Sequence, residues 1–278
     1  MAKILIVGAG DVGGRLARAL AADGHEVIAL RRRPAGLPGL RELAADVTRP
    51  ESLVLPDGLD VVVTALSPGE SGAEAYRRVY VEGTRALQRA LAGQRLRHQF
   101  WLSSTSVHGE DGGEVVDEDT PPHPASDTAR ALLDAEALVR ASSWPATIVR
   151  FGGLYGPGRP RLLRWVESGR PVQCQPPLWS NRLHVEDAAG FLRHLIGLAL
   201  AGRRPRALYL GVDDQPAPQH EVLAWLAGRM GLPAPPGEAR PGAGQGKRCL
   251  NRALRGSGYV LRYPDYRAGY AQVLQAIN

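Results

Sequence analysis

The feature that most constrains the fold is a glycine-rich turn near the start of the chain, Gly8-Ala9-Gly10-Asp11-Val12-Gly13. It separates a short apolar run, Lys3 to Gly8, from a stretch, Val12 to Asp23, whose apolar residues recur at helical spacing. Between a strand and a helix, the first glycine allows a tight turn, the second lets backbone approach a pyrophosphate, and the third permits close packing. We expect a dinucleotide to bind here, at Gly8, Gly10, Asp11, Val12 and Gly13; a tight turn without a ligand is the alternative.

Strand-like and helix-like segments alternate through the first half of the chain. The predicted strands are 3–8, 25–30, 59–66, 100–102 and 146–151, and the predicted helices are 12–23, 70–91 and 128–141. A strand–helix–strand order requires crossover connections between parallel strands. The sequence therefore predicts an α/β fold: a Rossmann-type, doubly wound, mostly parallel sheet.

The composition changes after Phe151, where proline, glycine and arginine become frequent and the predicted elements become shorter. We expect residues 1–151 to form an NAD(P)-binding core, to which 186–212 return as a helix and a strand. Residues 152–185 and 213–278 are expected to form a smaller C-terminal substrate lobe. In doubly wound folds, ligands bind beyond the carboxyl ends of the strands, which is where such a lobe belongs.

Composition limits the classes of partner. The net charge of +6 comes almost wholly from arginine, because lysine occurs only at Lys3 and Lys247. The basic residues are scattered and no nucleic-acid-binding motif is present, so an anionic small molecule is expected rather than nucleic acid. No apolar run approaches the roughly 18 residues of a membrane span, and no signal peptide is evident. Cys174 and Cys249 form no metal or redox motif, so we expect a cytoplasmic protein without a metal site.

The end of the second predicted strand indicates which dinucleotide is preferred. NAD-specific proteins place a carboxylate there, whereas this chain has Arg31, Arg32 and Arg33. Guanidinium groups bind a 2′-phosphate well, so NADP is predicted, with NAD possible and a solvated arginine loop as the alternative. Further contacts are expected at the ends of later strands, from Asp46 and Val47 at the adenine, and from Ala65 and Ser103.

Five segments together resemble the extended short-chain dehydrogenases/reductases of the NAD-dependent epimerase/dehydratase family, and more closely its atypical members. These are the glycine turn, Val81-Glu82-Gly83-Thr84, Ser103-Ser104-Thr105-Ser106-Val107-His108-Gly109, Arg150-Phe151-Gly152-Gly153-Leu154-Tyr155-Gly156-Pro157-Gly158 and His184-Val185-Glu186-Asp187. The resemblance covers nearly the whole chain and implies a nicotinamide cofactor and, as in many relatives, a homodimer formed through two long helices. The glycine spacing departs from the G-x-x-G-x-x-G of typical members.

The catalytic pair of the typical family is missing. Relatives use a Tyr-x-x-x-Lys pair to exchange a proton with the substrate, and a serine or threonine, here Ser104, to orient its oxygen. Thr128 and Leu132 stand at the tyrosine and lysine positions, and no Tyr-x-x-x-Lys occurs in the chain. A positioned acid or base contributes about 10²–10⁴-fold to a rate, so another group must supply it, or the chemistry is easy or absent.

Two residues are candidates to replace the missing pair. His108 stands where many relatives have tyrosine, and its usual pKa suits proton transfer near neutrality. Tyr155 lies in the turn expected at the edge of the substrate cleft. For each of these residues a structural role is the alternative: His108 would cap backbone groups, and Tyr155 would pack against its neighbours. Relatives also grip a substrate diphosphate with an arginine four residues before His184; here that residue is Ser180, with Arg182 nearby.

Two functions follow from these observations. The first is an NAD(P)-dependent oxidoreductase or epimerase-like enzyme, in which Ser104 holds the reacting oxygen and His108 or Tyr155 moves the proton. The second is a non-catalytic NADP-binding sensor, favoured by the missing tyrosine and lysine. The retained serine segment and substrate-lobe motifs favour the enzyme.

Overall fold

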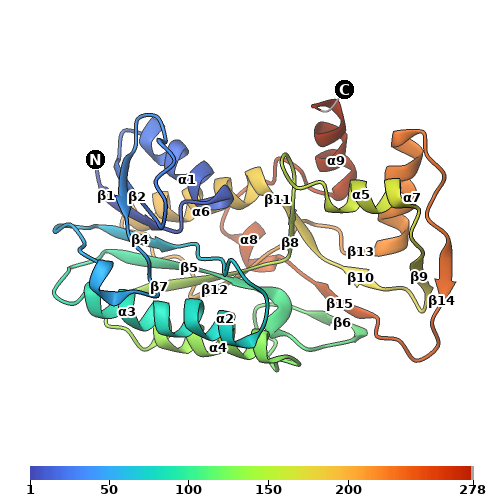
Figure 1. Ribbon diagram of the computed structural model, residues 1–278, viewed down its shortest axis with the longest axis horizontal. Helices are drawn as coiled ribbons and strands as arrows, with labels where there is room; N and C mark the ends of the chain where they lie inside the picture. The colour runs from blue at the N-terminus through green and yellow to red at the C-terminus, as the bar shows by residue number, and fades with distance from the viewer. Residues whose placement is uncertain (277–278) are drawn as a thin grey trace. The chain divides into compact units, whose positions relative to one another are not determined.

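The computed structural model describes residues 1–276, which divide into two compact units (Figure 1). Unit 1 consists of Met1–Val107, Pro124–Arg150 and Ala189–Tyr209, and unit 2 of His108–His123, Phe151–Ala188 and the described residues from Leu210 onward. The segment 108–123 belongs to unit 2, although the sequence analysis placed it in the core. The reason is a strand pairing: β6 (Gly112–Val116) runs parallel to β15 (Gly246–Cys249), far along the chain.

A seven-stranded sheet, counted over the described residues, forms the centre of the fold, in the order β12-β7-β5-β4-β1-β2-β3. Its strands are β1 (Lys3–Val7), β2 (Glu26–Arg31), β3 (Arg41–Ala44), β4 (Val61–Thr64), β5 (His98–Ser104), β7 (Ala146–Phe151) and β12 (Leu208–Gly211). The pairs β1–β2, β2–β3, β1–β4 and β4–β5 are parallel. The predicted Rossmann-type, doubly wound architecture is confirmed.

Helices cover both faces of this sheet, which explains why its inner strands are apolar throughout. Helices α1 (Asp11–Ala22) and α6 (Val185–Leu200) lie on one face, and α2 (Ala73–Tyr76), α3 (Gly83–Ala90) and α4 (Asp127–Arg140) on the other (Figure 1). With both faces covered, polar alternation is absent: every residue of β4 is buried. Two short 3₁₀ turns, Pro50–Ser52 and Thr105–Val107, complete this part of the chain.

The long helix predicted at 70–91 is present but not uniform. It consists of α2, a π-helical segment at Arg77–Glu82, and α3. A Cβ on Gly83 would lie 2.7 Å from a methyl carbon of Val47, so glycine allows the helix to approach the loop after β3. The π-helical segment directly precedes that contact, and π-helical turns inside α-helices are frequently found at functional sites.

Unit 2 is built from pairs of short strands and from helices. The pairs are β8 (Gly153–Tyr155) with β11 (Arg182–His184), β10 (Trp179–Ser180) with β13 (Ala217–Pro218), β9 (Val172–Gln175) with β14 (Gly237–Ala239), and β6 with β15. The helices are α5 (Arg161–Ser168), α7 (Gln219–Met230), α8 (Arg252–Gly256) and α9 (Tyr266–Gln275). Its own apolar core includes Tyr155, Leu163, Leu223, Tyr266 and Tyr270. Throughout residues 1–276, no helix has both the length and the apolar character needed to cross a membrane.

Candidate functional site

The glycine turn lies at the carboxyl end of β1, where the strand order reverses between β2 and β4, the usual ligand position in such sheets. Gly8 has a φ of +94°, and a Cβ there would lie 2.3 Å from the carbonyl oxygen of Ala65. A Cβ on Gly13 would lie 2.4 Å from the carbonyl oxygen of Gly8. Neither position accommodates a side chain, so both glycines are required by the backbone itself.

Gly10 differs from its two neighbours in this turn. No heavy atom lies within 4 Å of a Cβ built on Gly10. Gly10 also precedes α1 without any side-chain hydrogen bond to the first turn of that helix. The open approach and the positive end of the helix dipole suit an anionic group such as a pyrophosphate. The Asp11 carboxylate accepts a hydrogen bond from Arg15 at 2.7 Å, while Val12 and Gly13 are buried.

A cavity of about 230 Å³ opens next to this turn, entirely within unit 1. It collects seven of the predicted cofactor residues from four separate segments of the chain. They are Gly8, Gly10, Arg31, Arg32, Asp46, Val47 and Ala65. Arg33, Thr48 and Val79, the last from the π-helical segment, also belong to its wall. The remaining predicted cofactor residues, Asp11, Val12, Gly13 and Ser103, lie outside this lining.

The polar wall of the cavity is cationic. Arg31 is half-buried, and Arg32 and Arg33 are exposed at the end of β2, so no carboxylate stands where one would bind ribose hydroxyls. The Asp46 carboxylate is turned onto Thr48, accepting hydrogen bonds from its N–H at 2.9 Å and its hydroxyl at 2.8 Å. Burial raises the pKa of Asp46, but these bonds and the charge of Arg32 outweigh it and lower the pKa below its usual value. Asp46 is therefore a hydrogen-bonded anion, and the arginines are the donors facing the cavity.

Ser103 belongs to a buried charge network in unit 1. Its hydroxyl donates to Glu136 Oε1 at 2.7 Å. Arg150 donates to the same carboxylate from Nε at 2.9 Å and from Nη2 at 2.6 Å, and Arg140, the third residue to donate, does so at 3.2 Å. Sequence reasoning missed this network, because Glu136 lies on α4, 33 residues beyond Ser103. The hydroxyl of Ser103 thus fixes the end of β5 to α4.

Ser104 lies at the last position of β5, half-buried. Its hydroxyl oxygen accepts a hydrogen bond from the N–H of Ser106 at 3.1 Å. This bond fixes the side chain at the carboxyl edge of the sheet, where a hydroxyl can donate its proton to a ligand oxygen. This geometry suits the orienting role that the sequence predicts for Ser104.

The two positions aligned with the missing catalytic pair have structural roles. The Thr128 hydroxyl lies 3.0 Å from that of Ser126, which caps α4 by accepting from the N–H of Ala129. Leu132 is 4% exposed and packs with Tyr80, Trp101 and Val107. A lysine ammonium group in place of Leu132 would be surrounded by apolar side chains. This part of α4 therefore packs in the core and does not provide a proton-transfer site.

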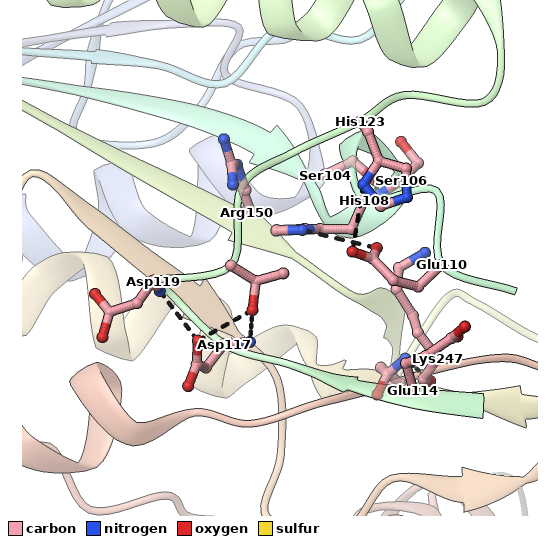
Figure 2. A network of polar contacts seen from close by, with 12 residues as sticks. Ser104, Ser106, His108, Glu110, Glu114, Asp117, Asp119, His123, Arg150 and Lys247 are labelled. Carbon is pink, nitrogen blue, oxygen red and sulfur yellow. Dashed lines mark hydrogen bonds and ion pairs between the residues drawn. The ribbon is translucent and has the colours of Figure 1, made fainter. Parts of the chain in front are cut away.

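His108, in unit 2, is 1% exposed and faces a carboxylate. Its Nδ1 lies 4.0 Å from Glu110 Oε2, and the other oxygen of Glu110 lies 3.4 Å from Nδ1 of His123 (Figure 2). His123 is well exposed, with 63% of its side chain accessible. Glu110 therefore stands between a buried and an exposed imidazole, an arrangement the sequence analysis did not anticipate although all three residues are close along the chain.

Tyr155 is buried in the apolar core of unit 2. Its ring stacks on Tyr270 at 4.5 Å and meets His184 edge-on at 5.2 Å, while its hydroxyl donates to the carbonyl oxygen of Asp265 at 3.3 Å. A Cβ on Gly269 would lie 2.0 Å from that hydroxyl, so glycine makes room for it. Burial and, next, the charge of Asp213 hold the pKa of Tyr155 far above its usual range. As placed, Tyr155 is a packed neutral phenol.

A second cavity, of about 820 Å³, lies entirely within unit 2. Tyr155 and Tyr270 form part of its wall, together with both strands of the β8–β11 pair and the start of α5. Five arginines line it: Arg159, Arg161, Arg164, Arg170 and Arg182. Sequence reasoning missed it as a site, although the arginine-rich run 159–170 was a visible signal.

The chain belongs to the family described as NAD(P)H-binding, whose model matches residues 8–173. That range begins at the glycine turn and includes all the segments of the unit 1 cavity. The protein is therefore an NAD(P)-binding protein with the fold of the short-chain dehydrogenases/reductases and NAD-dependent epimerases/dehydratases.

Three similar proteins place the chain within this group. It is 31% identical over 261 residues to a 3-diazoavenalumate denitrifying reductase of Streptomyces sp, covering 84% of this chain and 83% of the relative. A solved structure from Methylobacillus flagellatus, described as an NAD-dependent epimerase/dehydratase, is 41% identical, with a TM-score of 0.85 and coverage of 99% and 98%. MoeE5, solved with UDP-glucose and NAD, is 26% identical, with a TM-score of 0.78 and coverage of 98% and 97%.

Proposed function

We propose that this protein is an NADP-preferring oxidoreductase or epimerase-like enzyme that acts on an anionic carbonyl or hydroxyl substrate. One observation carries the cofactor preference: the unit 1 cavity presents Arg31, Arg32 and Arg33 and no carboxylate at the end of β2. A 2′-phosphate matches paired guanidinium groups in charge and geometry, whereas ribose hydroxyls alone do not require them. The similarity to a reductase and to an NAD-bound protein supports a redox role.

The roles of the chain's own residues follow the chemistry of their side chains. The bound nicotinamide supplies or accepts a hydride. Ser104, held by Ser106, would donate its hydroxyl proton to the reacting oxygen. Proton transfer falls to His108 or Tyr155, and the structure supports His108 better, since Glu110 faces its ring while Tyr155 is a packed phenol with a strongly raised pKa. The anionic character of the substrate is supported by the arginine-lined cavity of unit 2.

Titration of the full-length protein with NADPH and NADH tests the cofactor assignment. We expect NADPH to bind at least tenfold more tightly than NADH, and Arg31→Ala/Arg32→Ala to remove most of that difference. A matched control is Arg203→Ala/Arg229→Ala, which removes equal charge from exposed positions outside the cavity. Equal affinity for both nucleotides in the wild-type protein would contradict the NADP preference.

Turnover tests the catalytic half of the proposal. NADPH oxidation with a panel of anionic aldehydes and ketones should reveal activity, and Ser104→Ala should lower kcat by about 10²-fold, the lower end for a positioned group. An undiminished Ser104→Ala variant would remove its role.

A non-catalytic NADP sensor is the second candidate, favoured by Thr128 and Leu132 in place of the proton-transfer pair. NADPH binding that changes the limited-proteolysis pattern, without turnover of any substrate in the panel, would support the sensor over the enzyme. An unchanged pattern would count against it.

A further inference from the structure

Glu110 is a nearly buried carboxylate whose ion-pair partners are imidazoles. Its side chain is 11% exposed. Oε2 lies 4.0 Å from Nδ1 of His108, and Oε1 lies 3.4 Å from Nδ1 of His123 (Figure 2). Among residues 1–276, neither an arginine nor a lysine forms an ion pair with this carboxylate. Burial of a carboxylate is costly without a cationic partner, and an imidazole is cationic only while it holds a second proton.

The buried ion pair of unit 1 shows how a structural carboxylate is held in this chain. Arg150 donates to both oxygens of Glu136, at 2.9 and 2.6 Å. A guanidinium keeps its charge at all ordinary pH values, so that pair is permanent. Oε2 of Glu110, by contrast, is buried, and no hydrogen bond within the described part of the chain satisfies it. Glu110 therefore has neither the permanent cation nor the satisfied oxygens that a purely structural role would favour.

The two imidazoles differ in their access to water. His108 is 1% exposed, whereas 63% of the His123 side chain is accessible. A parallel backbone bridge pairs the two residues and fixes the spacing across which Glu110 lies. All three residues belong to unit 2. Water can thus exchange protons with His123 directly, and Glu110 is the titratable group that faces both rings.

The neighbouring ionisable groups are poor alternatives for carrying a proton. Burial raises the pKa of the Cys249 thiol to about 12, although Lys247 lowers it, so the thiol stays protonated; Glu118 acts on it in the same direction as burial. Glu114 is exposed, and backbone N–H groups, with smaller contributions from His123 and Lys247, hold its pKa below the usual value. Glu114 therefore stays an anion bound to backbone.

We propose that Glu110 carries protons between His123, which exchanges them with water, and the buried His108. Protonated His123 gives its Nδ1 proton to the carboxylate, the resulting carboxyl group turns, and it gives that proton to Nδ1 of His108. Water then reprotonates His123, so one proton enters for each proton delivered. Such transfers occur at about 2.6–3.2 Å or through one water, so the glutamate side chain approaches each ring in turn.

In the proposed enzyme, this path would restore the proton that His108 gives to the substrate. When the carbonyl carbon accepts a hydride, the carbonyl oxygen takes a proton from His108, and transfer through Glu110 recharges the ring from water. This use of the path rests on the proposed function, whereas the path itself does not. Glu110 and His123 are then positioning residues that act through His108.

Proton exchange at the ring of His108 tests the path without any substrate. In full-length protein carrying ¹⁵N-labelled histidine, the ring N–H signal of His108 is identified by its loss in His108→Gln. Saturation transfer from water gives the exchange rate of that proton. We expect Glu110→Gln to slow the exchange by roughly tenfold or more, because a carboxamide does not pass a proton from one ring to the other. A wild-type signal broadened away by exchange that appears in Glu110→Gln would be the same result. A wild-type exchange rate in a folded Glu110→Gln variant would overturn the proposal.

Two further variants separate a proton path from an effect of charge alone. Glu114→Gln is the matched control, because it removes the same charge near His123 from a carboxylate that forms no ion pair with His108 in the described structure. It should keep the wild-type exchange rate. His123→Gln should slow the exchange, and added imidazole should restore it by replacing the lost ring, whereas imidazole should not restore Glu110→Gln. Equal slowing in Glu114→Gln and Glu110→Gln, or no response of His123→Gln to imidazole, would contradict the path.

Turnover distinguishes failure of this inference from failure of the proposed function. With a substrate that is reduced, Glu110→Gln should lower kcat with little change in KM, and imidazole should raise kcat of His123→Gln but not of Ser104→Ala. A wild-type kcat in Glu110→Gln, together with slowed exchange, would overturn delivery of these protons to the substrate. Absence of turnover with every substrate would refute the enzyme, and the exchange rates would still decide the proton path.

Discussion

Glu136 and Arg150 form a bidentate ion pair with both side chains almost completely buried, at 0% and 1% exposure. Arg150 lies on β7 and Glu136 on α4, so the pair ties the sheet to the helix that covers it. Ser103, on β5, donates to the same carboxylate and joins a second strand to the network. The residue that the sequence suggested as a cofactor contact therefore supports the strand on which Ser104 stands.

Neutralising the carboxylate tests this network. Glu136→Gln should leave the buried Arg150 guanidinium uncompensated and lower the free energy of unfolding by about 3–5 kcal/mol. Urea denaturation followed by circular dichroism measures the loss. Arg140→Ala is the matched control, because Arg140 is about half exposed and its pair with Glu136 should contribute 1 kcal/mol or less. A similar loss in both variants would contradict the argument.

The glycine turn allows a structural requirement to be separated from a binding requirement. Gly8→Ala combines a φ of +94° with a Cβ 2.3 Å from the Ala65 carbonyl oxygen, so it should lower Tm by several degrees as well as weaken NADPH binding. Gly10→Ala meets no atom within 4 Å and should fold with little change in Tm, yet weaken NADPH binding by blocking backbone approach. Wild-type affinity in a folded Gly10→Ala variant would contradict the placement of the pyrophosphate.

A buried histidine on β5 should make the protein sensitive to acid. The Thr147 hydroxyl donates to the carbonyl oxygen of Arg206, so it accepts from Nε2–H of His98 at 2.8 Å. Burial, with a smaller contribution from Arg204, lowers the pKa of His98 to about 4. The unfolded chain thus binds more protons between pH 6.5 and 4, and stability falls as pH decreases through that window, by roughly 3 kcal/mol.

The variant His98→Gln isolates this contribution to the pH dependence. It should lose less stability than the wild-type protein between pH 6.5 and 4, even though its stability at pH 7.5 is lower through lost contact with Phe100. Chemical denaturation at several pH values gives both curves. Parallel curves would show that His98 does not supply the acid sensitivity.

The fold was predictable because its signals are local. The buried strands appear in the sequence as continuous apolar runs. The glycine turn is also a local signal, because close backbone contacts at Gly8 and Gly13 leave no room for a side chain. Long-range side-chain pairing was not predictable. Nothing near Ser103 in the sequence indicates that its hydroxyl would bond a carboxylate on α4.

The arginine-lined cavity was missed for a related reason. The arginines from Arg159 to Arg170 lie close together in the sequence, but they line one cavity with Arg182 only in the folded chain, where β8 pairs with β11. A charge pattern in the sequence indicates the sign of a partner's charge, but it does not show where in the fold the charged residues come together.

Asp213 should limit stability at alkaline pH, independently of any ligand. Its pKa is raised by burial to about 8, above the usual value of 3.8, so the folded state binds one more proton than the unfolded state between pH 4 and 8. Stability contributed by this group is therefore lost as pH rises through that window and is constant above it.

Asp213→Asn keeps an acceptor for the N–H of Gln215 and removes the ionisation. We expect it to be more stable than the wild-type protein at pH 8, by at most on the order of 5 kcal/mol, with the difference vanishing near pH 4. Asp214→Asn, at a neighbouring carboxyl group paired with Arg255, should show no such gain. A pH-independent difference between Asp213→Asn and the wild-type protein would mean that the buried carboxyl group does not titrate, and that its position beside Arg182 is structural alone.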